Sequence, residues 1–245
     1  MYSSFAEVYD CIFPVSASAL DLILGYVNSK TRILELGCGT GALLKELKAL
    51  RKVGLDIEPA LIAKAQKKIC FEPPEQSSFA QINAELDNAE FICAELMDFG
   101  PSQPAAAFDL IFSLGNVVSH LEPQQFKNWL ENIHRLLVPG GYWIFHIIHW
   151  DDILKFTDYS YPPLKRGDYI FNRNYSDISA QSLNFKTRLT QGEALVFEQK
   201  QILYPHSSAF LNQIHHGFKN LEIWADYAKN PPAGISRVLV MQRQP

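Results

Sequence analysis

Three glycines at alternate positions follow a short apolar run in the first quarter of the chain. The stretch ILELGCGTG contains the acidic residue Glu35 and then Gly37, Cys38, Gly39 and Gly41. Glycines let the backbone approach a ligand closely and adopt conformations that other residues avoid. A helix that begins just after them would direct unpaired N–H groups at the same ligand. The pattern predicts a ligand-binding turn between a buried strand and a helix; a tight turn that binds nothing is the alternative.

A carboxylate at the end of the next apolar run adds to this predicted site. The run KVGLD ends at Asp56, where a carboxylate can accept hydrogen bonds from both hydroxyls of a ribose. A dinucleotide site needs the spacing G-x-G-x-x-G, and here the third glycine comes one residue early. The spacing therefore disfavours a nucleotide-dependent oxidoreductase, for which fluorescence of bound NAD would be the test.

A second group of polar residues follows a later apolar run. FSLGNVVSHL turns at Gly115 and then presents the amide of Asn116 and the imidazole of His120. His120 could orient or deprotonate an attacking amine or hydroxyl, or it could cap the next helix. Asn116 could contact a substrate or the ligand of the glycine turn. We take Asn116 and His120 as the catalytic candidates.

No metal site is predicted. His146 and His149 form an H-x-x-H pattern, but residues three apart on a strand face opposite sides.

The elements that must position these residues alternate between strands and helices from Thr31 to His149. This alternation is typical of a parallel sheet that is covered on both faces. The expected strands are 32–36, 52–56, 90–94, 108–114 and 141–148, and helical periodicity occurs at 41–50, 59–69 and 123–137. The sequence PGG at 139–141 predicts a turn between the last helix and the last strand.

Four regions follow from the change in pattern along the chain. We expect an N-terminal helical cap (1–30), an α/β core (31–150), a small antiparallel sheet inserted as a lid (151–205), and a C-terminal helix with two last strands that complete the core (206–245). The fold class is α/β, with a mostly parallel Rossmann-like sheet and an antiparallel last strand.

The combination of motifs resembles the class I S-adenosylmethionine-dependent methyltransferases. Their E/D-x-G-x-G-x-G pattern matches Glu35, Gly37, Gly39 and Gly41, and their acidic residue after the second strand matches Asp56. An acidic residue followed by an apolar one after the third strand is also present, as Glu95 and Leu96 in CAELMDF. The resemblance spans 31–150 and implies the cofactor S-adenosyl-L-methionine, with S-adenosyl-L-homocysteine as its product.

The resemblance also implies roles for single residues. Gly37 and Gly39 would pass close to the methionine part of the cofactor, and Asp56 would hold its ribose. Ile57 and Leu96 would flank the adenine, and Glu95, where the family more often has Asp, would orient the adenine amino group. An aromatic residue of an N-terminal helix closes over the cofactor in related enzymes, which points to Tyr9 in FAEVYD. Leu114 would face the transferable methyl group.

The sequence LGNVVSHL resembles the small-molecule branch that includes glycine N-methyltransferases. The N/D-P-P-Y/F motif of DNA and many RNA or protein methyltransferases is absent from this strand end. The arginine that holds the amino-acid carboxylate in the glycine enzymes falls on Ile148, so glycine is not the expected substrate. Arg166, Arg173 or Lys165 in the lid could substitute for that arginine.

Composition sets the remaining limits. The 245 residues carry a net charge of −4 and no long uninterrupted apolar run, so neither nucleic acid nor membrane is expected as a partner. Four scattered cysteines and the lack of a secretory signal predict a cytoplasmic protein with reduced thiols.

We therefore predict a methyltransferase that passes a methyl group from S-adenosylmethionine to N or O of a small molecule. A macromolecular acceptor such as RNA or protein is one alternative, and a cofactor-binding protein without catalysis is another. The oligomeric state is left open.

Overall fold

The central element of the fold is a seven-stranded sheet. The structure is a computed structural model that describes residues 2–69, 89–213 and 217–245. The strand order is β11-β12-β5-β4-β1-β2-β3, and β11 and β12 run antiparallel to their neighbours. The strands are β1 (Arg32–Leu36), β2 (Arg51–Asp56), β3 (Ala89–Cys93), β4 (Phe108–Ser113), β5 (Leu137–Ile148), β11 (Phe218–Trp224) and β12 (Ser236–Arg243). The predicted mostly parallel sheet with an antiparallel last strand is confirmed.

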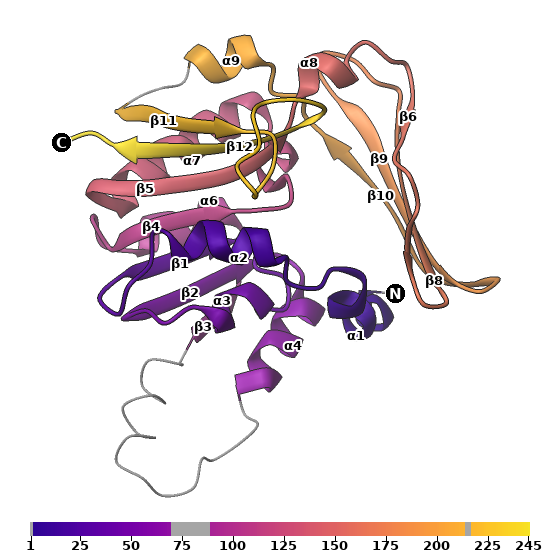
Figure 1. Ribbon diagram of the computed structural model, residues 1–245, viewed down its shortest axis with the longest axis horizontal. Helices are drawn as coiled ribbons and strands as arrows, with labels where there is room; N and C mark the ends of the chain where they lie inside the picture. The colour runs from indigo at the N-terminus through magenta and orange to yellow at the C-terminus, as the bar shows by residue number, and fades with distance from the viewer. Residues whose placement is uncertain (1, 70–88, 214–216) are drawn as a thin grey trace, which may run out of the picture.

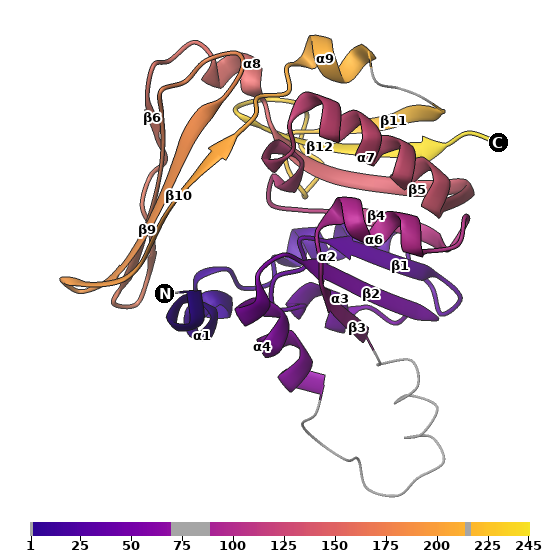
Figure 2. The same cartoon turned by 180° about the vertical axis from the view of Figure 1, so that it is seen from behind.

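Helices cover both faces of this sheet, as its continuous apolar strands require. Side chains of α6 and α7 pack with the strands in one apolar cluster, and side chains of α2 and α3 pack in a second cluster. The two faces are seen in Figures 1 and 2, with α2 in front in the first and α7 in front in the second. The helices are α2 (Ala17–Leu24), α3 (Ala42–Glu46), α4 (Pro59–Ile69), α6 (Leu96–Ser102) and α7 (Pro123–Leu136).

The turn predicted at 139–141 was wrong. β5 begins directly after α7 and runs through Pro139 and both glycines. Gly140 has φ +80°, and the register with β4 shifts between Phe108 and Leu110. The glycine pair therefore forms an irregularity near the start of β5 and not a turn that precedes the strand.

A second, antiparallel sheet forms from the segment after β5. Its path is β10-β9-β8-β6, and β7 also pairs with β8. The strands are β6 (Tyr159–Ser160), β7 (Leu164–Arg166), β8 (Tyr169–Ser176), β9 (Leu183–Gln191) and β10 (Ala194–Leu203). Figures 1 and 2 show this sheet standing beside the main body, from α8 (Trp150–Ile153) at its upper end to α1 (Tyr2–Ile12) near its lower end. That it acts as a lid stays a prediction.

Helix α1 packs between the two sheets. Its Phe5 stacks on Phe197 of β10 and Phe171 of β8, with ring centroids 4.4 and 6.0 Å apart. On its other side, Lys64 of α4 donates from Nζ to the carbonyl oxygens of Ala6 (2.7 Å) and Glu7 (2.9 Å). Helix α1 is therefore fixed to the main body and to the second sheet at once.

The remaining segments complete the chain. Helix α9 spans Ser208–Gln213, and the end predicted for it at Gly217 adjoins residues 214–216, which lie outside the described part. Cys11, Cys38 and Cys93 are free thiols, and Cys70 also lies outside the described part. No helix of the described residues is both long and apolar enough to cross a membrane.

Candidate active site

The glycine turn after β1 has the conformation and the crowding that require glycine. Gly37 and Gly41 have φ values of +74° and +67°, which residues with a side chain rarely adopt. A Cβ at Gly37 would lie 2.6 Å from a methyl group of Val117, and one at Gly41 would lie 2.2 Å from the ring of Phe91. The turn is held from below, because the N–H groups of Gly37 and Cys38 both donate to the Leu55 carbonyl at 2.8 Å.

Two carboxyl groups lie beside this turn, Glu35 near the end of β1 and Asp56 at the end of β2. Asp56 accepts from the N–H of Gly39 at 2.8 Å through one oxygen and from the N–H of Glu58 at 2.9 Å through the other. Each carboxylate oxygen can accept a second hydrogen bond, so Asp56 keeps acceptor capacity for a ribose. Burial raises the pKa of Asp56, although these backbone N–H groups act in the opposite direction.

Glu35 is the more deeply buried of the two. It is 6% exposed, and its Oε2 has no hydrogen-bond partner among the described residues. Burial, and next the negative charge of Asp56, raise the pKa of Glu35 well above its ordinary value. A buried carboxyl oxygen without a partner is costly unless a ligand supplies one. The charge and donors of a cationic amino acid moiety, as in S-adenosylmethionine, fit this position.

Tyr9 of α1 covers the turn from above. A Cβ on Gly39 would lie 3.1 Å from both Cε1 and the hydroxyl oxygen of Tyr9. Thr40 in the same turn donates from its hydroxyl to the carboxylate of Asp10, which also pairs with Lys64 at 3.6 Å. The structure thus brings together Tyr9, Glu35, the three glycines and Asp56.

The other predicted cofactor residues surround this group less closely. Cys38 is buried, and burial raises the pKa of its thiol far above the ordinary value, so it stays protonated. Ile57 follows β2 with 62% of its surface exposed. Its side chain is therefore accessible to a flat ring such as adenine. Glu95 is exposed just before α6; Leu96 begins that helix, and its side chain lies outside the described part.

Asn116 at the end of β4 holds neighbouring elements together. It lies in the left-handed region at φ +66° and is 8% exposed. Its Oδ1 accepts from the Ser119 hydroxyl at 2.8 Å and from the N–H of Ile148 at 3.0 Å. The Ser119 hydroxyl in turn accepts from the indole N–H of Trp150 at 3.0 Å. Only Nδ2 of Asn116 is left for a substrate, so its contact with an acceptor stays a prediction.

The role of Ser119 was missed in the sequence. It is fully buried in the short helix η1 (Val117–His120), and it ties the ends of β4 and β5 to α8 and to Tyr204, whose N–H donates to its carbonyl at 2.8 Å. No sequence signal marks a serine between an asparagine and a histidine as a junction of this kind.

His120 ends η1 and differs from its neighbours in being open to solvent. More than a third of its surface is exposed, yet surrounding protein desolvates it and lowers its pKa below 6.5. Desolvation disfavours the charged form of an imidazole, which explains the direction of this shift. Leu114, just before the turn, is partly buried. An imidazole that is neutral near pH 7 can accept a proton.

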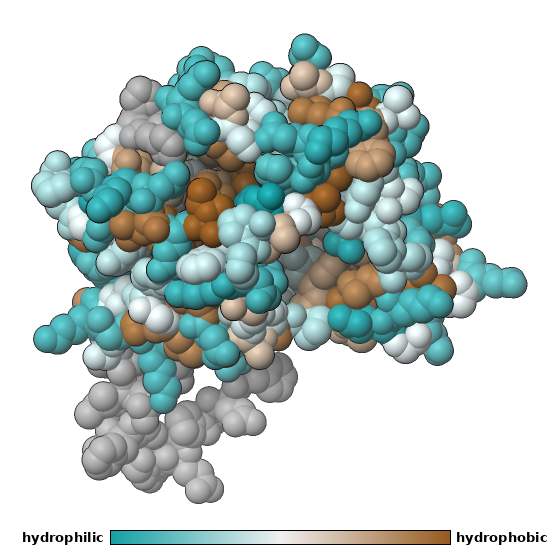
Figure 3. All heavy atoms as spheres, turned by 45° about the horizontal axis from the view of Figure 1, so that its top comes forward, coloured by the Kyte–Doolittle hydropathy of each residue, from teal (hydrophilic) through white to brown (hydrophobic). Residues whose placement is uncertain are grey.

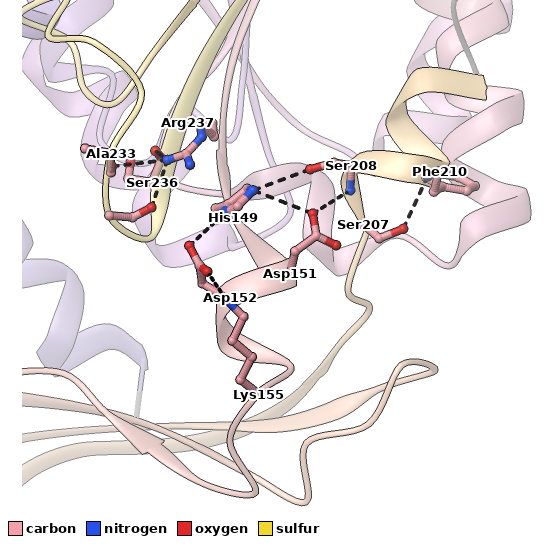
Figure 4. A network of polar contacts seen from close by, with 11 residues as sticks. His149, Asp151, Asp152, Lys155, Ser207, Ser208, Phe210, Ala233, Ser236 and Arg237 are labelled. Carbon is pink, nitrogen blue, oxygen red and sulfur yellow. Dashed lines mark hydrogen bonds and ion pairs between the residues drawn. The ribbon is translucent and has the colours of Figure 1, made fainter.

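His149, which follows β5, belongs to a different network (Figure 4). Its Nδ1 lies 2.8 Å from Asp152 Oδ2, and its Nε2 lies 3.4 Å from the Ser208 hydroxyl. Asp151 accepts from the N–H of Ser208 at 3.0 Å, so the network joins α8 to the start of α9. No cluster of three His, Cys, Asp or Glu suited to a metal occurs among the residues that the structure describes.

A cavity of about 240 Å³ lies beside this network. Its walls are mostly apolar side chains of α7, β5, β12 and α9, including Trp143 and Leu239, and it shares no residue with the predicted cofactor and catalytic residues. Figure 3 looks onto this side of the molecule, where hydrophobic residues gather in a hollow between hydrophilic ones. The cavity therefore contains none of the candidate site residues, and it adjoins them through Ile148 and Trp150, which donate hydrogen bonds to Asn116 and Ser119.

Comparisons with known proteins agree with this geometry. A family model described as a methyltransferase domain matches residues 34–143, which contain the glycine turn, Asp56 and His120. The match covers all of the predicted cofactor residues except Tyr9.

Solved structures share the fold over nearly the whole chain. An S-adenosylmethionine-dependent methyltransferase from Clostridium acetobutylicum is 16% identical with a TM-score of 0.74, covering 100% of this chain and 99% of that one. The CcbJ methyltransferase from Streptomyces caelestis is 14% identical with a TM-score of 0.71, covering 96% and 95%. CalS10 from Micromonospora echinaspora, an amino pentose methyltransferase in a structure with S-adenosylmethionine bound, is 15% identical with a TM-score of 0.63, covering 97% and 96%.

The methyltransferase-domain match and the shared fold support the same conclusion as the acidic and glycine residues at the strand ends. Residues 34–143 therefore form a methyltransferase domain, and the chain has the fold of S-adenosylmethionine-dependent methyltransferases.

Proposed function

We propose that this enzyme transfers the methyl group of S-adenosylmethionine to a nitrogen or oxygen atom of a small molecule. The observation that carries the proposal is His120, an exposed imidazole of lowered pKa at the end of η1, the short helix that follows β4. Tyr204, the residue directly after β10 of the second sheet, donates its N–H to the carbonyl of Ser119 in the same short helix. CalS10, whose fold is similar, acts on an amino pentose, which is a small acceptor of the same kind.

The residues of the glycine turn would hold the cofactor. Asp56 would accept the ribose hydroxyls, and Glu35 would face the amino acid moiety. Gly37 and Gly39 leave room for the ligand, and Tyr9 would cover it. The cofactor supplies an electrophilic methyl group on a sulfonium, and displacement at that carbon needs an acceptor atom held in line and shielded from water.

His120 would take the proton that the acceptor atom loses. A general base of this kind contributes about 10²- to 10⁴-fold in rate, and it must be neutral to act. Because desolvation lowers its pKa below 6.5, His120 is in the neutral form at pH 7. The buried chain of Asn116, Ser119 and Trp150 fixes the backbone of η1 and thereby the position of the imidazole.

The position of the second sheet favours a small acceptor over a macromolecular one. The sheet is attached to the main body at both ends, through Phe5 of α1 and through the contact of Tyr175 with Trp150, whose ring centroids lie 5.5 Å apart. A net charge of −4 gives no field that would attract a nucleic acid backbone.

The experiment is an assay of S-adenosylhomocysteine release with a panel of small amines, phenols and acids. We expect turnover with at least one class, an acid limb in kcat/KM with an inflection below pH 6.5, and a loss of about 10²-fold or more in His120→Asn. His134→Asn is the control, because His134 lies in the last turn of α7 against Gly217, at the end of that helix away from η1. Turnover of RNA or protein alone, or full activity in His120→Asn, would reject the proposal.

A further inference from the structure

One face of the second sheet looks toward the main body. On β8, Phe171 stacks on Phe5 of α1, and Tyr175 contacts Trp150 of α8. Successive side chains of a strand alternate between faces, so Arg173 lies on this same inner face, between the two attachment points. Figures 1 and 2 show that the stretch of sheet between α1 and α8 stands across from the ends of the central strands.

Apolar residues form most of this inner face. Beside Phe171, the cross-strand neighbours are Leu189 of β9 and then Phe197 of β10, which are 0% and 2% exposed. At the other end, Leu183 and Leu203 are paired and buried in the main apolar cluster. The inner face is thus built like a core surface at both ends.

A polar row interrupts it between these ends. Arg173 is paired with Thr187, and Thr187 with Gln199, so the three lie side by side across β8, β9 and β10. Cross-strand neighbours of this kind have Cβ atoms about 5 Å apart. Thr187 is only 8% exposed. A guanidinium, a hydroxyl and an amide therefore meet on a face that is mostly apolar, where Gln201 of β10, paired with Phe185, is a further polar residue.

The guanidinium of Arg173 has no anionic partner. It lies over the ring of Tyr161 with 4.6 Å from Cζ to the ring centroid, and that ring is fixed by the 3.3 Å contact between the hydroxyls of Tyr161 and Tyr175. Nε of Arg173 is buried without a hydrogen-bond partner, and no carboxylate of the described residues lies within 4.0 Å. A partly buried cation with an unused donor is costly unless something else binds it.

The outer face of the same sheet shows the contrast. Arg188 of β9 is exposed and lies 3.9 Å from Glu198, which also pairs with Lys186 at 3.0 Å. Charges on that face therefore have partners and solvent, and the unpaired arginine is confined to the inner face.

We propose that Arg173, with Thr187 and Gln199 beside it, binds an anionic group of the methyl acceptor, either a carboxylate or a phosphate monoester. The fork of guanidinium N–H groups matches the paired oxygens of both, and the stacking on Tyr161 holds it in place for them. The assignment rests on the proposed function, because it takes the space between the second sheet and the strand ends as the acceptor site.

Binding to the complex with S-adenosylhomocysteine tests the anion site without turnover. Calorimetric titration would use benzoate and phenyl phosphate as anionic probes and benzamide as the uncharged control. We expect at least one anion to bind and benzamide to bind about tenfold or more weakly. Arg173→Gln should weaken the anion about tenfold to hundredfold, and Arg188→Gln should leave it unchanged. The two anions separate a carboxylate site from a phosphate site.

The outcomes separate this proposal from the proposed function. If neither anion binds, or if Arg173→Gln binds it as tightly as the wild type, the anion site is wrong even when small molecules are methylated. If an anion binds through Arg173 but no small molecule in the acceptor panel is methylated, the anion site stands and the proposed function fails. For any acceptor that is turned over, replacing its anionic group by the amide should lower kcat/KM in the wild type and not in Arg173→Gln.

Discussion

The ring of Tyr9 lies directly over Gly39, so close that a Cβ on the glycine would be 3.1 Å from the tyrosine hydroxyl oxygen. The N-terminal helix thus contacts the cofactor turn itself. We expect Tyr9→Ala to weaken S-adenosylhomocysteine binding about tenfold, because a ring over the sulfur or carboxylate end contributes on the order of 1 kcal/mol or more. Calorimetric titration would measure it.

Tyr9→Phe separates the two ways in which Tyr9 could act. If the ring covers the ligand, the phenylalanine variant keeps nearly full affinity, whereas a contact through the hydroxyl predicts a loss similar to that of alanine. Unchanged affinity in Tyr9→Ala would remove Tyr9 from the cofactor site.

Asp56 provides the second prediction. Asp56→Asn keeps the size of the side chain but replaces one acceptor oxygen by a donor, which opposes the N–H of either Gly39 or Glu58. S-adenosylhomocysteine affinity should fall about tenfold to hundredfold. Glu58→Gln is the matched control, because the Glu58 carboxylate is near the same turn but does not lie at the end of the strand. Equal affinities in wild type and Asp56→Asn would contradict the ribose assignment.

The cofactor half of the site could be read from the sequence because its residues are close together along the chain. The strand at 32–36, the three glycines and Asp56 each carry a local signal, and parallel strands bring their carboxyl ends to one edge whatever the details of packing. All five expected core strands are present, and their bounds differ from the prediction by no more than one residue except at the start of β5, which begins at Leu137 instead of residue 141. The helix expected at 41–50 is shorter because it ends at Glu46.

The acceptor half could not be read in the same way. Contacts such as Phe5 with Phe197, or the row from Arg173 to Gln199, depend on strand register and on how two sheets meet. Neither leaves a pattern within a short window of sequence. Asn116 has a local signal, but its use by Ser119 and Ile148 as a buried acceptor appears only when β4, η1 and β5 are placed together.

Ser119 is the basis of the third prediction. Ser119→Ala leaves the indole N–H of Trp150, a residue that is 1% exposed, without its acceptor. A buried donor without a partner costs about 1–3 kcal/mol, so urea unfolding should show a lower free energy of unfolding by that amount. Ser160→Ala, on an exposed strand of the second sheet, should change it by about 0.5 kcal/mol or less. Equal stabilities of the two variants would contradict the role of Ser119 as a junction.

His206 makes the stability of the enzyme depend on pH. It is 1% exposed, its Nε2 lies 3.1 Å from the Val118 carbonyl, and its Nδ1 is buried without a partner. The carbonyl only accepts, so Nε2 carries the proton and Nδ1 is bare. Burial lowers the pKa of His206 to about 4, against about 6.5 in the unfolded chain.

The sign of the effect follows from these two values. Between pH 6.5 and 4 the unfolded chain binds a proton at His206 that the folded enzyme does not, so stability is full above pH 6.5 and falls as the pH drops toward 4. His146, whose pKa burial also lowers to about 4, acts in the same direction, whereas the raised pKa values of Glu35 and Asp56 act in the opposite one. A comparison with a His206 variant cancels these other groups.

We therefore expect His206→Gln to be less stable than the wild type at pH 7 but less sensitive to acid. Between pH 7 and pH 5 the wild type should lose about 2 kcal/mol more of its free energy of unfolding than the variant does. Urea titrations of both proteins at the two pH values measure this difference directly. Parallel losses in the two proteins would show that His206 binds its proton as readily in the folded enzyme as in the unfolded chain, which its buried contact with the rings of Phe126 and Phe210 opposes.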